Sequence, residues 1–187
     1  MKEVTGKSVS DWFGTRRYKI AFGGGCHWCT EAVFLSLKGV EKVEQGFVAS
    51  TGANDSFSEA VIVHYDLEEI DLRTLIEIHL HTHRSSSEHS MRDTYRSAIY
   101  YCSNEQKEEV LLWLKELQKD FSDKLITKVL PIQAFKPSRD DILNYYYKNP
   151  EKPFCKTFIN PKLALLLKLF SNQVNTQKLE HLEQSKV

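Results

Sequence analysis

Residues 18–39, YKIAFGGGCHWCTEAVFLSLKG, decide how the chain begins to fold and where its chemistry is placed. The first five, YKIAF, have the composition of a β-strand. The three glycines that follow permit a tight turn, and the apolar residues after them recur at helical spacing as far as Gly39, which suits a helix end. The stretch therefore predicts a strand, a glycine turn and a helix whose N-terminus carries Cys26.

A cysteine at a helix N-terminus is the first feature that points to chemistry. Backbone N–H groups and the positive end of the helix dipole stabilise a thiolate there, so Cys26 is a candidate nucleophile. The competing interpretation is a small core residue, which is the commoner fate of cysteine. The glycines directly before Cys26 favour the nucleophile, because they let a reacting atom approach the backbone closely.

The C-x-x-C spacing of Cys26 and Cys29 admits two further interpretations. A zinc site needs more ligands, and Cys102 and Cys155 stand apart without a second C-x-x-C, so zinc is not favoured. A redox pair remains open, because Cys29 lies one helical turn beyond Cys26 and can form a disulfide with it. A helix residue without chemistry remains the alternative for Cys29.

Composition sets the outer bounds of the prediction. A chain of 187 residues with 41% hydrophobic content suits one well-buried domain. Lys plus Arg and Asp plus Glu both number 25, so no net charge draws the molecule to nucleic acid or to an anionic membrane. No apolar run approaches the roughly 20 residues that span a bilayer, and MKEVTGKSVSDW lacks the apolar centre of a signal peptide. We therefore expect a cytoplasmic protein with reduced thiols.

Strands and helices alternate along the chain. We expect strands at 18–22, 40–50, 57–66, 96–103 and 124–135, and helices at 26–39, 67–83, 104–121 and 161–170. The 104–121 helix is expected to begin at an Asn cap, and the strand at 124–135 to be closed by a proline. This order predicts an α+β fold, a ferredoxin-like sandwich of helices on a small mixed β-sheet. The expected parts are an N-terminal extension (1–17), a single domain (18–170) and a polar C-terminal tail (171–187).

Four blocks of the sequence are similar to segments of one enzyme family. GGGCHWCTE resembles a G-C-F-W-G-x-E signature, and FSEAVIVHYD resembles an H-A-E-A-V-x-V-x-Y-D strand. TYRSAIYYCSNEQ resembles a Q-Y-R-S-A-I-Y segment, and FKPSRDDILNYYYKNPEKPFC a tyrosine-rich stretch that ends in cysteine. The blocks occur in the same order across most of residues 18–170, so the chain resembles the peptide methionine sulfoxide reductase A family.

The resemblance implies a reaction and the two cysteines that carry it. The reaction is thiol-dependent reduction of methionine S-sulfoxide, free or in proteins, through a cysteine sulfenic acid and an intramolecular disulfide. Cys26 takes the place of the attacking cysteine and Cys155 that of the resolving cysteine, while Cys29 competes for the second role. The implied reductant is a thioredoxin-like protein, with no bound cofactor, and the expected enzyme is a monomer.

Two further residues match the family's groups on the oxygen side. Reduction of a sulfoxide leaves negative charge on its oxygen, so an acid is needed there. The resemblance assigns this role to Glu59, which lies on an otherwise apolar strand, and to Tyr95. The alternatives are a solvated glutamate on a strand face and an ordinary half-buried tyrosine. Glu31, which also matches the signature, is expected to support the site.

The substrate-binding residues include the main departures from the family. Trp28 matches a tryptophan that walls the pocket for the substrate methyl group, while His27 replaces the phenylalanine of the other wall and makes it more polar. Ser90 stands where the family has an aspartate, with Asp93 nearby at a different spacing. The loop before Glu59, which carries a second sulfoxide-binding tyrosine in the family, is shorter. These changes bear on substrate preference and turnover more than on the thiol chemistry.

Two other functions stay open. The first is a family-derived thiol oxidoreductase that acts on another small sulfoxide or disulfide through Cys26 and Cys29. The second is a catalytically weak module that binds a sulfoxide or a metal. The HLHTH run puts His79 and His83 on one helix face with His89 beyond, but the sequence positions no third ligand, so no metal site is expected. The aromatic run NYYYKNP has few basic residues around it, so no nucleic-acid partner is expected.

Overall fold

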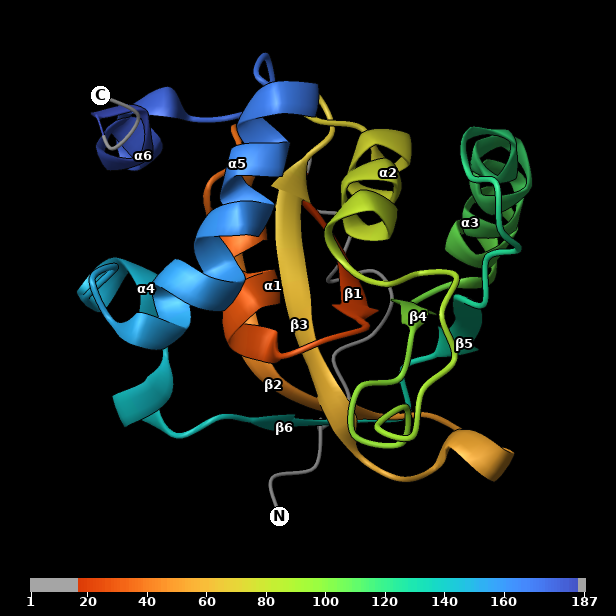
Figure 1. Ribbon diagram of the computed structural model, residues 1–187. Helices are drawn as coiled ribbons and strands as arrows, with labels where there is room; N and C mark the ends of the chain where they lie inside the picture. The colour runs from red at the N-terminus through yellow and green to blue at the C-terminus, as the bar shows by residue number, and fades with distance from the viewer. Residues whose placement is uncertain (1–16, 185–187) are drawn as a thin grey trace.

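The computed structural model describes residues 17–184 (Figure 1). Its strands are β1 (Arg17–Gly23), β2 (Val40–Ala49), β3 (Ser58–Asp66), β4 (Ala98–Tyr101), β5 (Lys128–Pro131) and β6 (Ala134–Pro137). Its α-helices are α1 (His27–Leu35), α2 (Leu72–Thr82), α3 (Asn104–Leu117), α4 (Tyr145–Lys148), α5 (Asn160–Leu169) and α6 (Glu180–Gln184). A π-helical turn, Cys155–Ile159, leads directly into α5.

The strands form one mixed sheet in the order β5-β4-β1-β3-β2-β6. Neighbouring strands are antiparallel, except that β4 and β5 are parallel. The inner order β4-β1-β3-β2, with α1 between β1 and β2 and α2 between β3 and β4, is the ferredoxin-like arrangement. The expected α+β fold class is therefore confirmed.

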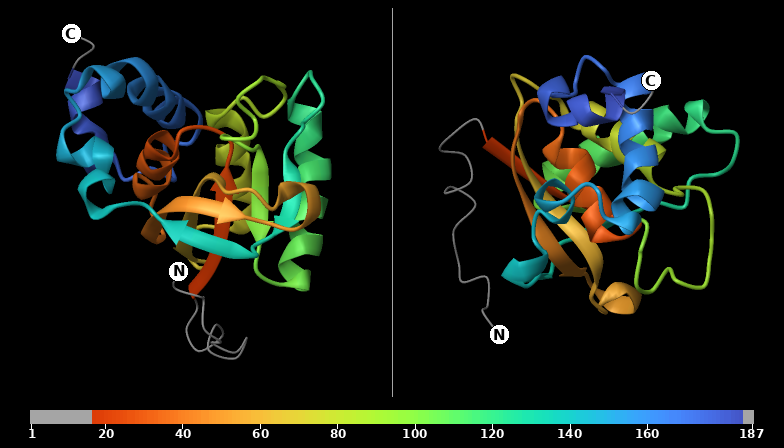
Figure 2. Two further views of the ribbon diagram at one scale, coloured as in Figure 1. Left: turned by 90° about the horizontal axis from the view of Figure 1, so that it is seen from below. Right: turned by 60° about the vertical axis from the view of Figure 1, so that its left-hand side comes forward.

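The main hydrophobic core lies between the sheet and the helices that cover one of its faces. Figures 1 and 2 show α1, α2 and α5 together on this face. The period-two alternation of β1 points Ile20 and Phe22 into this core and Ala21 to the opposite face. Phe22 stacks on Phe34 of α1 with ring centroids 4.7 Å apart. Burying each ring contributes about 1.5–3 kcal/mol, so α1 is fixed against the centre of the sheet.

The opposite face of the sheet is filled by a smaller apolar cluster because the sheet curls. Only Ile132 and Gln133 join β5 to β6, although these strands stand at the two ends of the strand order. The two edges are tied where they meet: Ser50 Oγ donates to the Pro131 carbonyl at 2.7 Å, and the Gln133 N–H donates to the Ala49 carbonyl at 3.0 Å. The curl covers the smaller cluster without a second layer of helices.

The element boundaries correct three expectations. The strand expected at 124–135 is two strands, since Pro131 lacks an N–H and ends β5. The cap of α3 is Ser103 rather than Asn104, because Ser103 Oγ accepts the Gln106 N–H at 3.2 Å. The helix expected from residue 67 begins at Leu72, after an Asp71 cap.

Residues after α5 continue the folded structure as far as it is described. Val174 and Leu179 are fully buried, and α6 packs beside them. The expected division into an extension, a domain and a tail stays a prediction, because nearly all of the extension lies outside the described residues. Within residues 17–184, no helix has the length and apolar character needed to cross a membrane.

Candidate active site

Cys26 occupies the N-cap position of α1, directly after the glycine turn, as the sequence predicted. Its half-buried side chain makes no capping hydrogen bond, and its sulfur is a free thiol. Gly24 makes the tight turn possible: an added Cβ would lie 2.4 Å from His83 Cδ2. The backbone N–H groups of the first turn and the helix dipole favour negative charge at this position.

Cys29 is buried one helical turn further on, and its thiol is hydrogen-bonded to that of Cys26. This bond lowers the pKa of Cys29 and raises that of Cys26, and the nearby Lys162 charge further favours a Cys29 thiolate. The backbone N–H of Trp28 lowers the pKa of Cys26, because it donates a hydrogen bond to the charged sulfur. The thiols therefore ionise as a pair, with one negative charge that either sulfur can carry while the other donates to it.

Glu59 reaches the same helix terminus from β3. It pairs with Phe47 across the sheet, and its Oε2 accepts the backbone N–H of His27 at 2.9 Å. Its side chain is 16% exposed, so it faces the site rather than open solvent. The carboxyl thus stands beside the residue that follows the candidate nucleophile, as the resemblance predicted.

Tyr95 stands close to both groups on the loop before β4. Burial raises the pKa of its hydroxyl, and the charges of Glu59 and Cys26 raise it further. The loop is anchored by Arg92, which donates to the Gly24 carbonyl at 3.2 Å and to the Tyr95 carbonyl at 3.0 Å. The structure therefore brings a thiol, a carboxyl and a phenol together from three separate segments.

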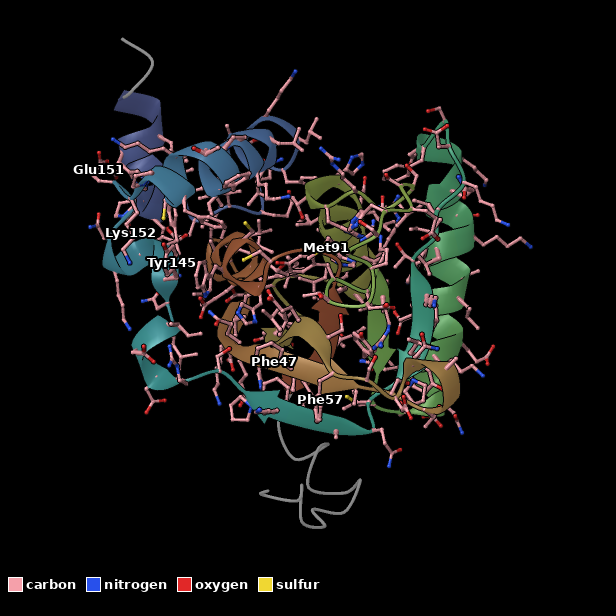
Figure 3. The ribbon with its side chains drawn as sticks, turned by 60° about the horizontal axis from the view of Figure 1, so that its bottom comes forward. Phe47, Phe57, Met91, Tyr145, Glu151 and Lys152 are labelled. Atoms are coloured by element: carbon pink, nitrogen blue, oxygen red, sulfur yellow. The ribbon has the colours of Figure 1, made fainter. Side chains whose placement is uncertain are left out.

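An aromatic wall borders the thiols on one side. Trp28 stacks on Tyr145 with centroids 4.0 Å apart and planes at 4°, and Phe154 meets the Trp28 ring edge-on at 5.3 Å. The Lys152 ammonium lies over the outer face of Tyr145 at 4.0 Å from its centroid. Figure 3 shows Tyr145 and Lys152 on one side of α1 and the half-exposed Met91 on the other.

His27 closes the site on the β2 side. Its ring is 4% exposed, meets Phe47 edge-on at 5.1 Å, and places Nδ1 at 3.0 Å from the Gly46 carbonyl oxygen. Gly46 also permits the close pairing of β2 with β6, because an added Cβ would lie 2.3 Å from the Lys136 carbonyl oxygen. His27 and Trp28 both lie at the N-terminus of α1, with their ring centroids 6.4 Å apart, and their role as substrate-binding residues stays a prediction.

Glu31 supports the aromatic wall rather than the reacting groups. This buried carboxylate accepts the Gln45 amide at 2.8 Å, the Asn144 N–H at 2.9 Å and the Tyr145 N–H at 3.4 Å. Asn144 has a left-handed backbone, with φ of 53°. Glu31 thus holds the turn that presents Tyr145 to Trp28, which agrees with the supporting role expected from the sequence.

Cys155 lies within the same region but is fully buried. It begins the π-helical turn after Phe154, and its Sγ donates to the Asn149 carbonyl at 3.5 Å. A thiolate at Cys155 would raise the pKa of Cys29, which places the two sulfurs near each other. Cys29 is therefore hydrogen-bonded to Cys26, whereas Cys155 acts on Cys29 only through its charge.

His79 and His83 brace the glycine turn. The rings stack at 4.1 Å, His79 Nε2 donates to the Gly23 carbonyl at 2.9 Å, and His83 Nε2 accepts from Ser97 Oγ at 2.8 Å. Burial holds the pKa of His79 well below its usual range and lowers that of His83 to about 4, so both are neutral at pH 7. Within residues 17–184, no group of three or more His, Cys, Asp or Glu side chains could hold a metal ion.

Comparison with known proteins identifies the family. A family model described as peptide methionine sulfoxide reductase matches residues 18–175. The chain belongs to this family. The peptide methionine sulfoxide reductase MsrA of Pasteurella multocida (strain Pm70) is 36% identical over 155 residues, which cover 75% of this chain and 89% of the relative.

Solved structures share the fold of this family member. The reduced form of Mxr1 from Saccharomyces cerevisiae gives a TM-score of 0.66 at 22% identity, covering 76% of this chain and 91% of that one. Mxr1 in complex with Trx2 gives a TM-score of 0.55 at 21% identity, covering 69% of this chain and 84% of that one. At these identities, the likeness supports the fold alone.

Relative to the peptide methionine sulfoxide reductase signature, this chain departs on the oxygen side of the site. Ser90 and Asp93 are both exposed, and the short link from β2 to β3 is a 3-10 turn, Gly52–Asn54. The sequence interpretation gave no individual role to Tyr145 or Phe154. The signal for these two was the tyrosine-rich block that ends at Cys155, but block similarity does not reveal which ring faces Trp28.

Proposed function

We propose that this chain reduces methionine S-sulfoxide, free or in proteins, to methionine at the expense of thiols. The observation that carries the proposal is the cluster at the N-terminus of α1. Cys26 stands there with a free sulfur, Glu59 is bound to the next N–H at 2.9 Å, and the charges of both raise the pKa of Tyr95. These are a nucleophile, an acid and an oxygen-side donor in one place.

The first half of the reaction transfers oxygen to Cys26. The Cys26 thiolate attacks the sulfoxide sulfur while Glu59 gives a proton to the oxygen and Tyr95 donates a hydrogen bond to it. The attack forms a bond between the two sulfurs. The hydroxyl then passes from the substrate sulfur to Cys26: the sulfur–sulfur bond and the substrate sulfur–oxygen bond break, an oxygen–sulfur bond forms at Cys26, and methionine leaves with two more electrons on its sulfur. Cys26 is left as a sulfenic acid.

The second half removes that oxygen as water. A thiol attacks the Cys26 sulfenic acid, a disulfide forms, and the hydroxyl leaves with the thiol proton. Family resemblance supports Cys155 as this thiol, but the hydrogen bond between Cys26 and Cys29 favours Cys29 for the first disulfide. In this proposal Cys155 then exchanges with Cys29, and the influence of its charge on Cys29 supports that step.

The aromatic wall accounts for recognition of the substrate methyl group. Trp28 presents an apolar ring beside Cys26, backed by the stacked ring of Tyr145, and the His27 ring lies 6.4 Å from that of Trp28. Apolar ring faces bind a methyl group and exclude water from the reacting sulfur. A stacked pair also keeps its geometry when the substrate leaves, so the pocket is preformed.

The external partner in this proposal is a thioredoxin-like dithiol, with no bound cofactor. Cys26 is only partly buried, so the first disulfide, Cys26–Cys29, is open to attack from outside before Cys155 exchanges into it. All four cysteines are free, which suits a protein of the reducing cytoplasm, and we propose that it works as a monomer. Light scattering of the purified chain tests the monomer.

The test of this function is dithiothreitol-driven reduction of N-acetyl-methionine sulfoxide, with the S and R epimers assayed separately. We expect loss of the S epimer alone. Cys26→Ser should abolish the reaction, and Cys102→Ser should not, since Cys102 is exposed at the far end of β4 from the glycine turn. Reduction by Cys26→Ser, or no reduction of either epimer by the folded unsubstituted chain, would refute the proposal.

A second candidate is a thiol–disulfide oxidoreductase that works through Cys26 and Cys29, and the hydrogen bond between these thiols favours it. The two functions differ in their need for Cys29. A sulfoxide reductase releases one methionine per chain even as Cys29→Ser, because only Cys26 takes up the oxygen. Reduction of a protein disulfide that disappears in Cys29→Ser, together with no methionine release, would support the second candidate.

A further inference from the structure

His27 has its tautomer fixed by the backbone. Nδ1 lies 3.0 Å from the Gly46 carbonyl oxygen, and a carbonyl oxygen only accepts hydrogen bonds. Nδ1 therefore carries a hydrogen whenever the ring is neutral, and the lone pair of the neutral ring is on Nε2. The ring is 4% exposed, so bulk water does not exchange freely with that lone pair.

The Nε2 atom of His27 faces the carboxyl assigned as the acid. It lies 3.8 Å from Glu59 Oε2, the same oxygen that accepts the His27 backbone N–H at 2.9 Å. A proton on Nε2 makes an imidazolium–carboxylate ion pair, and a proton on Glu59 makes a neutral acid facing a bare ring nitrogen. Both arrangements hold one proton, and only its position differs.

The other ionisable groups around this pair come from two segments. Cys26 and Cys29 lie on the same helix as His27, and Tyr95 approaches Glu59 from the loop before β4. The neighbour from β2 is Phe47, whose ring carries no charge. Negative charge on the thiol pair favours a positive or protonated His27–Glu59 pair beside it.

We propose that His27 and Glu59 share one proton, which Glu59 delivers to the sulfoxide oxygen. His27 is then a positioning residue that keeps a proton available to Glu59. The inference rests on the function proposed above. Before attack, Cys26 is a thiolate and the pair holds one proton. Attack moves that proton to the oxygen of the new sulfenic acid and leaves a neutral ring beside a carboxylate. When an external dithiol reduces the disulfide and frees Cys26 as a thiolate, the released proton returns to the pair.

The kinetic test is the pH dependence of methionine release in a single turnover without reductant. The unsubstituted chain is compared with His27→Phe, which keeps an apolar ring, and with His27→Gln, which can still donate to Gly46 but cannot carry the proton. We expect both variants to fall about tenfold or more behind the unsubstituted rate at neutral pH, because Glu59 then lacks the ring nitrogen that shares its proton and an acid contributes about 10²–10⁴-fold. Equal pH profiles for the unsubstituted chain and His27→Phe would overturn the inference.

A second test does not depend on turnover. Imidazole nitrogen NMR follows protonation of Nε2, and His27→Phe assigns the signal among the seven histidines. We expect Nδ1 to stay protonated throughout and the protonation of Nε2 to change in Glu59→Gln, because the partner carboxylate is lost. An unchanged midpoint overturns the shared proton. A shifted midpoint with no methionine release at any pH would support the shared proton and refute the proposed function, so the two failures are distinguishable.

Discussion

Replacing Glu31 by alanine tests how the site is held together. The buried carboxylate accepts two short hydrogen bonds, from the Gln45 amide at 2.8 Å and the Asn144 N–H at 2.9 Å. A hydrogen bond to a charged group is worth about 1.5–3 kcal/mol, and the alanine variant leaves both donors without this acceptor. Glu31→Ala should therefore lower the free energy of unfolding by about 3–6 kcal/mol, a large part of the roughly 5–15 kcal/mol typical of a domain.

Urea unfolding of the purified chain measures this loss, with Glu31→Gln as the matched control. Glutamine keeps an acceptor oxygen but loses the charge, so it should lose about half as much stability. Because Glu31 holds the turn before Tyr145, the alanine variant should also raise the KM for N-acetyl-methionine sulfoxide. A loss below about 1 kcal/mol in Glu31→Ala would refute the reasoning, because it would mean that these bonds carry no net stability.

Three other changes follow from the same geometry. Tyr145→Leu removes the ring stacked on the pocket tryptophan and should raise KM several-fold with a smaller effect on kcat, because stacked rings are worth about 0.5–1.5 kcal/mol; unchanged KM would exclude this ring from the pocket. Lys162→Met should raise the pKa of Cys29, seen as a shift of its alkylation profile to higher pH in a Cys26→Ser background; an unshifted profile would contradict the Lys162 charge effect. The His64 hydrogen bond holds the pKa of Glu44 at about 2, below the usual 4.5. The pair therefore stabilises the fold above about pH 4.5, and this contribution is lost as the pH falls toward 2. The difference in unfolding free energy between the unsubstituted chain and Glu44→Gln should shrink over that window, and a constant difference would refute the assignment.

Local sequence signals predicted most of the fold. The alternation in β1 and β3 and the helical spacing after the glycines depend on residues close in the chain, which pattern reasoning captures. The division at Pro131 was missed because IQAF after it continues an apolar run. Only the curled sheet, which brings Ala49 to Gln133, shows that this run contains two strands, one at each edge of the sheet.

The candidate site was predictable where one residue matched one family position. Cys26, Glu59 and Tyr95 meet at the N-terminus of α1, as the resemblance implied. The fixed tautomer of His27 was not predictable, because it depends on a carbonyl of β2 that is 19 residues away in the chain. The hydrogen bonds of His79 and His83 were not predictable either, because their partners lie far along the chain, in β1 and just before β4.

The most direct test of the account is a stoichiometric count in the absence of reductant. Reduced protein is mixed with excess N-acetyl-methionine S-sulfoxide, and released N-acetyl-methionine, remaining thiols and disulfide partners are measured. We predict one N-acetyl-methionine per chain and the loss of two thiols. The disulfide formed should contain Cys26, or Cys29 if exchange has followed. Release of methionine by Cys26→Ser, or no release by the folded unsubstituted chain, would contradict the assignment of Cys26 as the residue that takes up the oxygen.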